Sequence, residues 1–81
     1  MRIAFIGFGE VGYYFARDLA GSGLEITAYR RRREPAEARA RETRVRLCAT
    51  LGEALDGAEV VLSCVWPHSA LEAARDAAPF L

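Results

Sequence analysis

Short apolar segments alternate with stretches of helical periodicity along the 81-residue chain. The apolar segments predict four strands, at residues 3–7, 24–29, 45–48 and 59–65. The segments after them predict four helices, at about residues 10–21, 35–42, 51–56 and 69–79. In the first helix, Val11, Phe15 and Leu19 recur at i, i+4 and i+8. The order βαβαβαβα indicates an α/β fold with a parallel sheet and right-handed crossovers.

Two of the predicted helices begin with a capping-box pattern, in which Ser or Thr is followed three residues later by Glu. Thr50 and Glu53 form one such pair, and Ser69 and Glu72 form the other. The fourth predicted strand, at 59–65, is almost continuously apolar, as expected for a parallel strand that is covered on both faces. These patterns support the alternation of helix and strand.

A Gly-x-Gly-x-x-Gly turn joins the first predicted strand to the first predicted helix, at Gly7, Gly9 and Gly12. In such a turn the first glycine permits a tight bend, the second lets the backbone approach a pyrophosphate, and the third allows close packing of the helix. The unpaired N–H groups and the positive dipole end of the helix then face the phosphates. Because the turn lies between a strand and a helix, it predicts a Rossmann-type dinucleotide-binding domain with strand order 3-2-1-4.

Four consecutive arginines follow the second predicted strand, at residues 30–33. At this point of the fold a carboxylate hydrogen-bonds the 2′-hydroxyl of NAD, whereas arginine accommodates the 2′-phosphate of NADP. We therefore expect NADP(H) in preference to NAD. Since all eleven basic residues of the chain are arginines, a solvated basic loop is the alternative. We expect Arg30 and Arg31 to bind the 2′-phosphate, with Arg32 assisting and Arg33 solvated.

Three segments resemble the N-terminal domain of the β-hydroxyacid dehydrogenases, which include 6-phosphogluconate dehydrogenase, 3-hydroxyisobutyrate dehydrogenase and their imine-reductase relatives. The segments are residues 3–12, 26–31 and 57–62. They are followed at residues 65–67 by Val-Trp-Pro, where the family often has Leu-Pro. The resemblance covers essentially all 81 residues, and it is specific to the cofactor domain more than to the reaction.

The resemblance implies that the amides of Phe8, Glu10 and Val11 line the pyrophosphate. It also implies that Val65 and Trp66 border the ribose and nicotinamide. Glu10 departs from the neutral residue common in the family, and we expect its side chain to point to solvent, because a carboxylate repels a diphosphate. From the residues alone, we favour packing of Trp66 on the end of the sheet over stacking on the nicotinamide. The family's Ser-Gly-Gly segment and catalytic lysine would lie beyond residue 81, so no catalytic residue is assigned.

The sequence thus predicts that residues 1–81 form the NADP(H)-binding portion of an oxidoreductase. The resemblance implies hydride transfer between nicotinamide and a small hydroxyacid or imine-type substrate. One alternative is the front end of a pyrroline-5-carboxylate or ketopantoate-type reductase, and another is a non-catalytic NADPH-binding or sensor module. Because four parallel strands leave an open edge, we expect a longer or truncated protein. The resemblance implies a helical domain, absent from these residues, that binds substrate and supplies dimerisation. Self-association through that edge, or a homodimer of the full-length protein, is also expected.

Composition excludes several other functions. The formal net charge of zero gives no general attraction to nucleic acids or membranes. No segment approaches the roughly 18 apolar residues of a membrane span, and no signal peptide is evident, so we expect a cytoplasmic protein. Cys48 and Cys64 lack metal-type spacing and fall on predicted outer strands about 14 Å apart. We expect them to be buried free thiols, and we expect no metal site.

Overall fold

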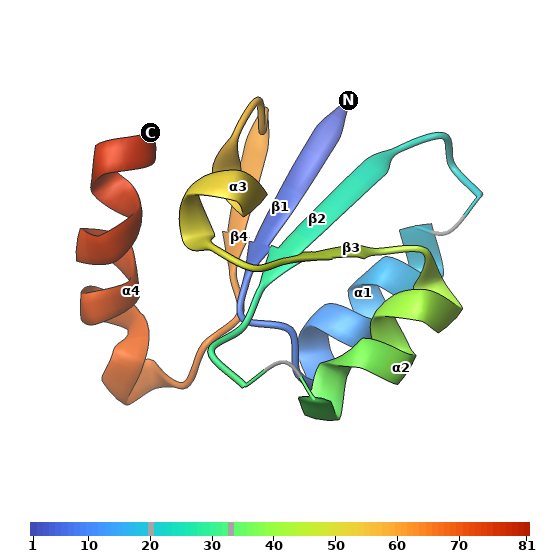
Figure 1. The fold of residues 1–81 in the computed structure, drawn as a ribbon, viewed down its shortest axis with the longest axis horizontal. Coiled ribbons are helices and arrows are strands. Elements are labelled where there is room, and N and C mark those ends of the chain that lie inside the picture. Colours follow the sequence, from blue (N-terminus) through green and yellow to red (C-terminus); the bar gives the residue numbers. More distant parts are fainter. Residues whose placement is uncertain (20, 33) are drawn as a thin grey trace.

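The computed structural model describes residues 1–19, 21–32 and 34–81. Four strands form one parallel sheet in the order β3-β2-β1-β4 (Figure 1). The strands are β1 (Arg2–Ile6), β2 (Glu25–Tyr29), β3 (Arg46–Cys48) and β4 (Val60–Ser63). The predicted α/β fold with strand order 3-2-1-4 is therefore confirmed, although β4 ends two residues earlier than predicted.

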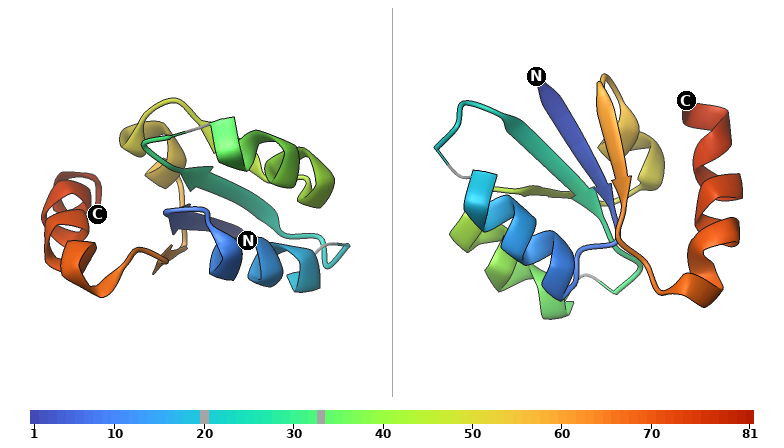
Figure 2. Two further views of the ribbon diagram at one scale, coloured as in Figure 1. Left: turned by 90° about the horizontal axis from the view of Figure 1, so that it is seen from below. Right: turned by 180° about the vertical axis from the view of Figure 1, so that it is seen from behind.

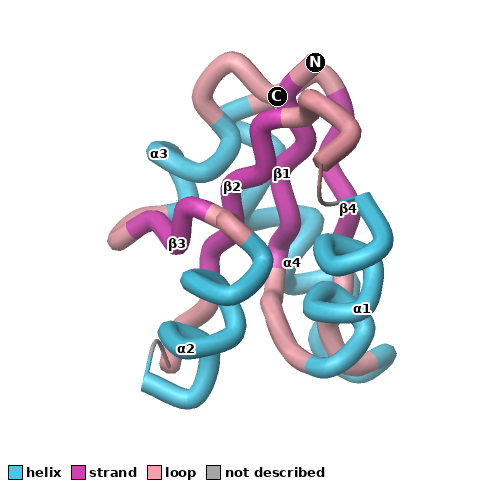
Figure 3. Tube along the Cα trace, turned by 90° about the vertical axis from the view of Figure 1, so that its right-hand side faces the viewer, coloured by secondary structure: helices cyan, strands magenta, loops and turns pink. Residues whose placement is uncertain are grey.

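Helices follow each of the strands. They are α1 (Glu10–Leu19), α2 (Glu34–Thr43), α3 (Leu51–Leu55) and α4 (Ala70–Ala77), with 3-10 turns η1 (Pro67–Ser69) and η2 (Ala78–Phe80) flanking α4. Both views in Figure 2 place α4 on the opposite side of the molecule from α1 and α2. Since α1 and α2 lie in front of the sheet in Figure 3 and α4 lies behind it, the sheet is covered on both faces.

Alternate residues of β1 contribute to two separate core clusters. Phe5 belongs to the cluster under α1 and α2, whereas Ala4 and Ile6 pack on the other face with residues of α3 and α4. The buried hydroxyl of Thr27 on β2 donates a hydrogen bond of 2.6 Å to the carbonyl oxygen of Ala54. This bond attaches α3 to β2.

Helix α1 buries its small residues and leaves two of its large apolar residues exposed. Gly12 and Ala16 are buried, while Val11 is 60% exposed and Phe15 is 51% exposed. The helix passes so close to the preceding turn that a Cβ on Gly12 would lie 3.1 Å from Cδ1 of Phe8. The periodic pattern predicted the helix correctly, but much of its large apolar stripe faces outward.

One of the two predicted capping boxes forms in part: Thr50 caps the helix, while the Glu53 side chain contacts the Thr50 hydroxyl in place of its backbone N–H. The Thr50 side chain accepts a hydrogen bond of 3.2 Å from the Glu53 N–H, and its hydroxyl lies 3.3 Å from the Glu53 carboxylate. Within the described chain, Ser69 at the start of α4 forms no such cap, because η1 holds it in a helical conformation (φ −105°, ψ −3°) instead of the extended one that capping requires. The predicted helix start is correct, and the predicted box at Ser69 is wrong.

Candidate cofactor-binding site

The turn between β1 and α1 gathers backbone N–H groups at the carboxyl end of the sheet. The Gly7 N–H bonds to the Tyr29 carbonyl at 2.8 Å, and the Tyr13 N–H bonds to the Gly9 carbonyl at 3.0 Å to close the first turn of α1. As at the start of any α-helix, the N–H groups of residues 9–12 have no carbonyl partner inside the helix. Together with the positive end of the helix dipole, they form an arrangement that favours anions.

Each glycine of the turn has a different environment. Gly7 has φ +86°, and a Cβ there would lie 2.8 Å from the carbonyl oxygen of Cys64, so the end of β1 can approach β4 only with glycine at this position. A Cβ on Gly9 would meet no heavy atom of the described residues within 4 Å. Gly7 and Gly12 are therefore required for close packing within the fold, whereas Gly9 leaves open space in front of the turn.

A pocket of about 280 Å³ opens beside this turn. Its walls come from the glycine turn, the end of β2, the segment after β4, and α4. The predicted site residues that line it are Gly7, Phe8, Gly9, Arg30, Arg31, Val65 and Trp66. Residues that were predicted from two distant parts of the sequence, the glycine turn and the arginine run, thus meet in one pocket.

A second pocket, of about 510 Å³, adjoins the first and lies against α1. Its predicted site residues are Gly9, Glu10, Val11, Val65 and Trp66. The two pockets share four lining residues: Gly9, Cys64, Val65 and Trp66. They therefore form adjacent parts of one surface along the carboxyl edge of the sheet.

Some predicted site residues lie elsewhere or differ from expectation. Arg32 is exposed and is not among the described residues that line either pocket, and Gly12 is buried against Phe8. Arg33 falls outside the described residues. The expectation that Trp66 packs on the end of the sheet is wrong, because β4 ends at Ser63 and Trp66 stands in the following loop with 75% of its surface exposed.

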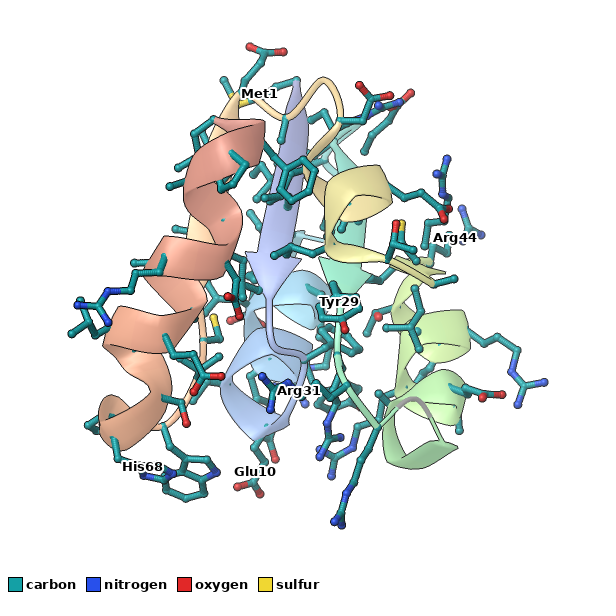
Figure 4. All side chains as sticks on the ribbon, turned by 60° about the vertical axis from the view of Figure 1, so that its left-hand side comes forward. Met1, Glu10, Tyr29, Arg31, Arg44 and His68 are labelled. Carbon is teal, nitrogen blue, oxygen red and sulfur yellow. The ribbon has the colours of Figure 1, made fainter. Side chains whose placement is uncertain are left out.

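The first pocket has cationic and anionic residues on facing elements. Arg31, labelled in Figure 4, follows the end of β2. Its Nη2 lies 2.9 Å from Oε1 of Glu72 on α4. Asp76, one helical turn further along α4, lines the same pocket. Reasoning from the sequence missed Glu72 as a pocket residue, because its position after Ser69 indicated a helix cap.

Cys64 lies where the two pockets meet. Both cysteines are free thiols as expected, but only Cys48 is buried; Cys64 is partly buried because it follows the end of β4. Burial raises the pKa of the Cys64 thiol above its ordinary value. The group is therefore protonated near neutral pH, and in that state it is a weak nucleophile.

Two other kinds of site were sought in the described parts of the chain. Residues 1–19, 21–32 and 34–81 contain no group of three or more His, Cys, Asp or Glu side chains that could hold a metal ion. Over the same residues, no helix has both the length and the apolar character needed to cross a membrane.

Residues 2–79 match the protein family described as "NADP oxidoreductase coenzyme F420-dependent". The chain belongs to this family. The match covers the glycine turn, the arginines after β2 and the segment after β4, which are the parts that form the two pockets. No curated protein matches the chain.

Three solved structures are similar to this one. A conserved protein of unknown function, itself described as similar to 3-hydroxyacid dehydrogenases, has a TM-score of 0.86 and 34% identity, over 100% of this chain and 31% of its own. Arogenate dehydrogenase from Synechocystis has a TM-score of 0.89 and 23% identity, over 100% and 29%. Imine reductase from Pseudomonas sp. has a TM-score of 0.72 and 22% identity, over 88% and 24%. The last two show the fold alone.

The predicted resemblance to dehydrogenase cofactor domains is confirmed by the family and by the fold. The chain is a Rossmann-type domain of an oxidoreductase family that uses a nicotinamide cofactor. It spans less than one third of each of the three similar structures.

Proposed function

We propose that the chain binds NADP(H) and presents its nicotinamide for hydride transfer in an oxidoreductase. The observation that carries this proposal is the meeting, in one pocket, of the glycine turn with Arg30 and Arg31. Backbone N–H groups at a helix start suit the pyrophosphate. Guanidinium groups suit the 2′-phosphate, since their planar fork can bind its oxygens in pairs. The two features therefore correspond to the two charged parts of NADP.

The pyrophosphate is proposed to lie over the glycine turn. The amides of Phe8, Glu10 and Val11 would bind its oxygens, and the open space at Gly9 would allow the close approach. Glu10 is exposed (Figure 4), so its carboxylate can remain in water, where repulsion of the diphosphate is screened. An acidic residue in the first turn also favours the helix itself.

The 2′-phosphate is proposed to bind Arg30 and Arg31, with Arg32 assisting from the edge. A charge-assisted hydrogen bond contributes about 1.5–3 kcal/mol, and less where it is exposed to water. Arg31 is largely exposed. One or two such bonds would therefore give NADP roughly a tenfold advantage over NAD.

The nicotinamide half is proposed to enter the second pocket, past Val65 and Trp66. In open α/β sheets, ligands bind outside the carboxyl ends of the strands, where the chain leaves in opposite directions from neighbouring strands. Here β1 is flanked by β2 on one side and β4 on the other, and the two pockets adjoin at this place. An extended dinucleotide would cross from the first pocket to the second over Gly9.

Residues 1–81 would act as the cofactor domain of an enzyme that resembles 6-phosphogluconate and 3-hydroxyisobutyrate dehydrogenases. A helical domain outside these residues would bind a small hydroxyacid or imine-type substrate and supply dimerisation, in a cytoplasmic protein. Because the family description also names coenzyme F420, the longer protein should be assayed with F420 as well as with hydroxyacids and imines.

The test is an amide NMR titration of the protein with NADPH and, separately, with NADH. We expect saturable shifts at Gly7, Gly9 and Gly12, with NADPH binding several-fold tighter. Arg31→Ala should remove most of this difference and leave NADH binding unchanged. Arg46→Ala, at an exposed position on β3, is the matched control and should change neither affinity.

Equal affinities for the two nucleotides would contradict the 2′-phosphate assignment. A dispersed spectrum that neither nucleotide perturbs would contradict cofactor binding by this chain altogether.

A further inference from the structure

The contact between Arg31 and Glu72 crosses the pocket proposed for the adenosine half of the cofactor. The two residues are 41 positions apart and come from the end of β2 and from α4, yet their side chains meet at 2.9 Å. Both line the first pocket, together with the glycine turn. A ligand phosphate that uses the Arg31 guanidinium must therefore take the place of the Glu72 carboxylate or share the guanidinium with it.

The face of α4 that borders this pocket carries a second carboxylate. Asp76 follows Glu72 by four residues, a spacing that puts both on the same side of a helix, and both line the pocket. An acidic wall disfavours an anionic ligand, since like charges repel at short range. The pocket thus holds arginines that attract a phosphate and, opposite them, carboxylates that oppose it.

We propose that Glu72 is a specificity-determining residue, which competes with the 2′-phosphate of the cofactor for Arg31. This inference rests on the proposed function. In the unliganded protein Glu72 is paired with the guanidinium, and the 2′-phosphate of NADP(H) must displace it or share the guanidinium with it. An adenosine without a 2′-phosphate leaves the pair intact and is not affected by the competition. Glu72 therefore lowers the preference for NADP(H) that the arginines create.

The size of the effect follows from the exposure of the pair. Arg31 and Glu72 have side-chain exposures of 75% and 65%, and ion pairs so open to water are weak. The need to break the Arg31–Glu72 ion pair therefore lowers the affinity for the 2′-phosphate by about two- to fivefold. Competition of this size adjusts the preference between the cofactors without preventing NADP(H) from binding.

The experiment uses two adenosine fragments, 2′,5′-ADP and 5′-AMP, whose affinities for the purified protein are measured by calorimetry. Glu72→Gln removes the charge and keeps the shape of the side chain, so 2′,5′-ADP should bind about two- to fivefold tighter while 5′-AMP is unchanged. In an Arg31→Ala background the same substitution should have no effect. Asp76→Asn, in the same pocket, is the control for general charge and should change the ratio of affinities much less than Glu72→Gln, because among the described residues it is Glu72 that pairs with Arg31.

Each other outcome overturns the inference in a recognisable way. An unchanged ratio in Glu72→Gln, with 2′,5′-ADP still bound by the wild type, removes the role of Glu72 and leaves the proposed function standing. An equal gain in the Arg31→Ala background, or in Asp76→Asn, shows general repulsion in place of competition. If the wild type binds neither fragment, the proposed function and the inference both fail. Amide spectra establish that each variant is folded, and Glu72→Ala, which suits a helix, is a second variant at this position.

Discussion

Replacing Gly9 with alanine is expected to separate cofactor binding from folding. The substitution adds one methyl group at the start of α1, where the described residues leave its position free of heavy atoms within 4 Å. The methyl group would project into the space that the pyrophosphate is proposed to occupy. The folded protein should therefore accept it, whereas the bound dinucleotide should not.

The expected change in stability is small because two effects oppose each other. Gly9 precedes the first residue of α1, and alanine at a helix N-cap costs about 0.5–1 kcal/mol relative to the preferred residues, glycine being close to them. Alanine also restricts the unfolded chain, which stabilises the fold by about 0.4–1 kcal/mol where the backbone conformation is compatible. The free energy of unfolding should therefore change by less than about 1 kcal/mol.

The expected change in binding is larger. If the added methyl group keeps the pyrophosphate from reaching one backbone N–H, a charge-assisted hydrogen bond of about 1.5–3 kcal/mol is lost. This corresponds to a loss of roughly ten- to a hundredfold in affinity for NADPH.

Gly7→Ala is the matched comparison, because here the same change should damage the fold. A residue other than glycine at φ +86° costs about 1–2 kcal/mol, and the Cβ would lie 2.8 Å from the Cys64 carbonyl oxygen. Relieving such a contact typically costs about 1–3 kcal/mol more. The sum is a large share of the roughly 4–12 kcal/mol expected for a chain of this length.

Urea denaturation followed by circular dichroism gives the stability of each variant, and calorimetric titration with NADPH gives its affinity. Gly9→Ala should unfold at nearly the wild-type urea concentration and bind NADPH weakly, while Gly7→Ala should unfold at a much lower concentration. If Gly9→Ala binds NADPH as tightly as the wild type, the pyrophosphate does not approach the turn at this residue. The placement of the cofactor would then be refuted.

Two further predictions concern the sheet and the thiol. Thr27→Val removes the buried hydrogen bond to the Ala54 carbonyl, so it should lower the free energy of unfolding by about 1–3 kcal/mol without changing NADPH affinity; an unchanged urea midpoint would show that the bond adds nothing to stability. Because burial raises the pKa of Cys64, less thiolate is present at any given pH, and alkylation of Cys64 in a Cys48→Ser variant should require more alkaline solution than alkylation of a free cysteine. If Cys64 is alkylated faster than free cysteine at neutral pH, this reasoning is contradicted. Bound NADPH should slow the alkylation further, since Cys64 lines both pockets.

The topology could be predicted from the sequence because few arrangements satisfy its local patterns. Alternating apolar and helical segments require a parallel sheet, and right-handed crossovers leave a small number of strand orders. The spacing of Gly7, Gly9 and Gly12 then placed the turn correctly at the carboxyl end of β1. These features depend on residues that are close together in the sequence, which is why one sequence was enough.

Contacts between distant elements were not predictable in the same way. The letters at Ser69 and Glu72 fit a capping box, and nothing local indicates that Glu72 instead bonds to Arg31, 41 residues earlier. The face of α1 that is buried could not be predicted from the sequence for a related reason. Hydrophobicity favours the large side chains of Val11 and Phe15, but close packing at Gly12 decides which face meets the core.

Trp66 is the only tryptophan in the chain, and its position gives the domain an intrinsic optical probe. The residue is 75% exposed at the junction of the two pockets, so in the unliganded state its emission should be that of an indole in water. Any molecule that settles in either pocket would change the polarity around this ring. Occupancy of the whole cleft could thus be followed by fluorescence in real time, without attaching a dye.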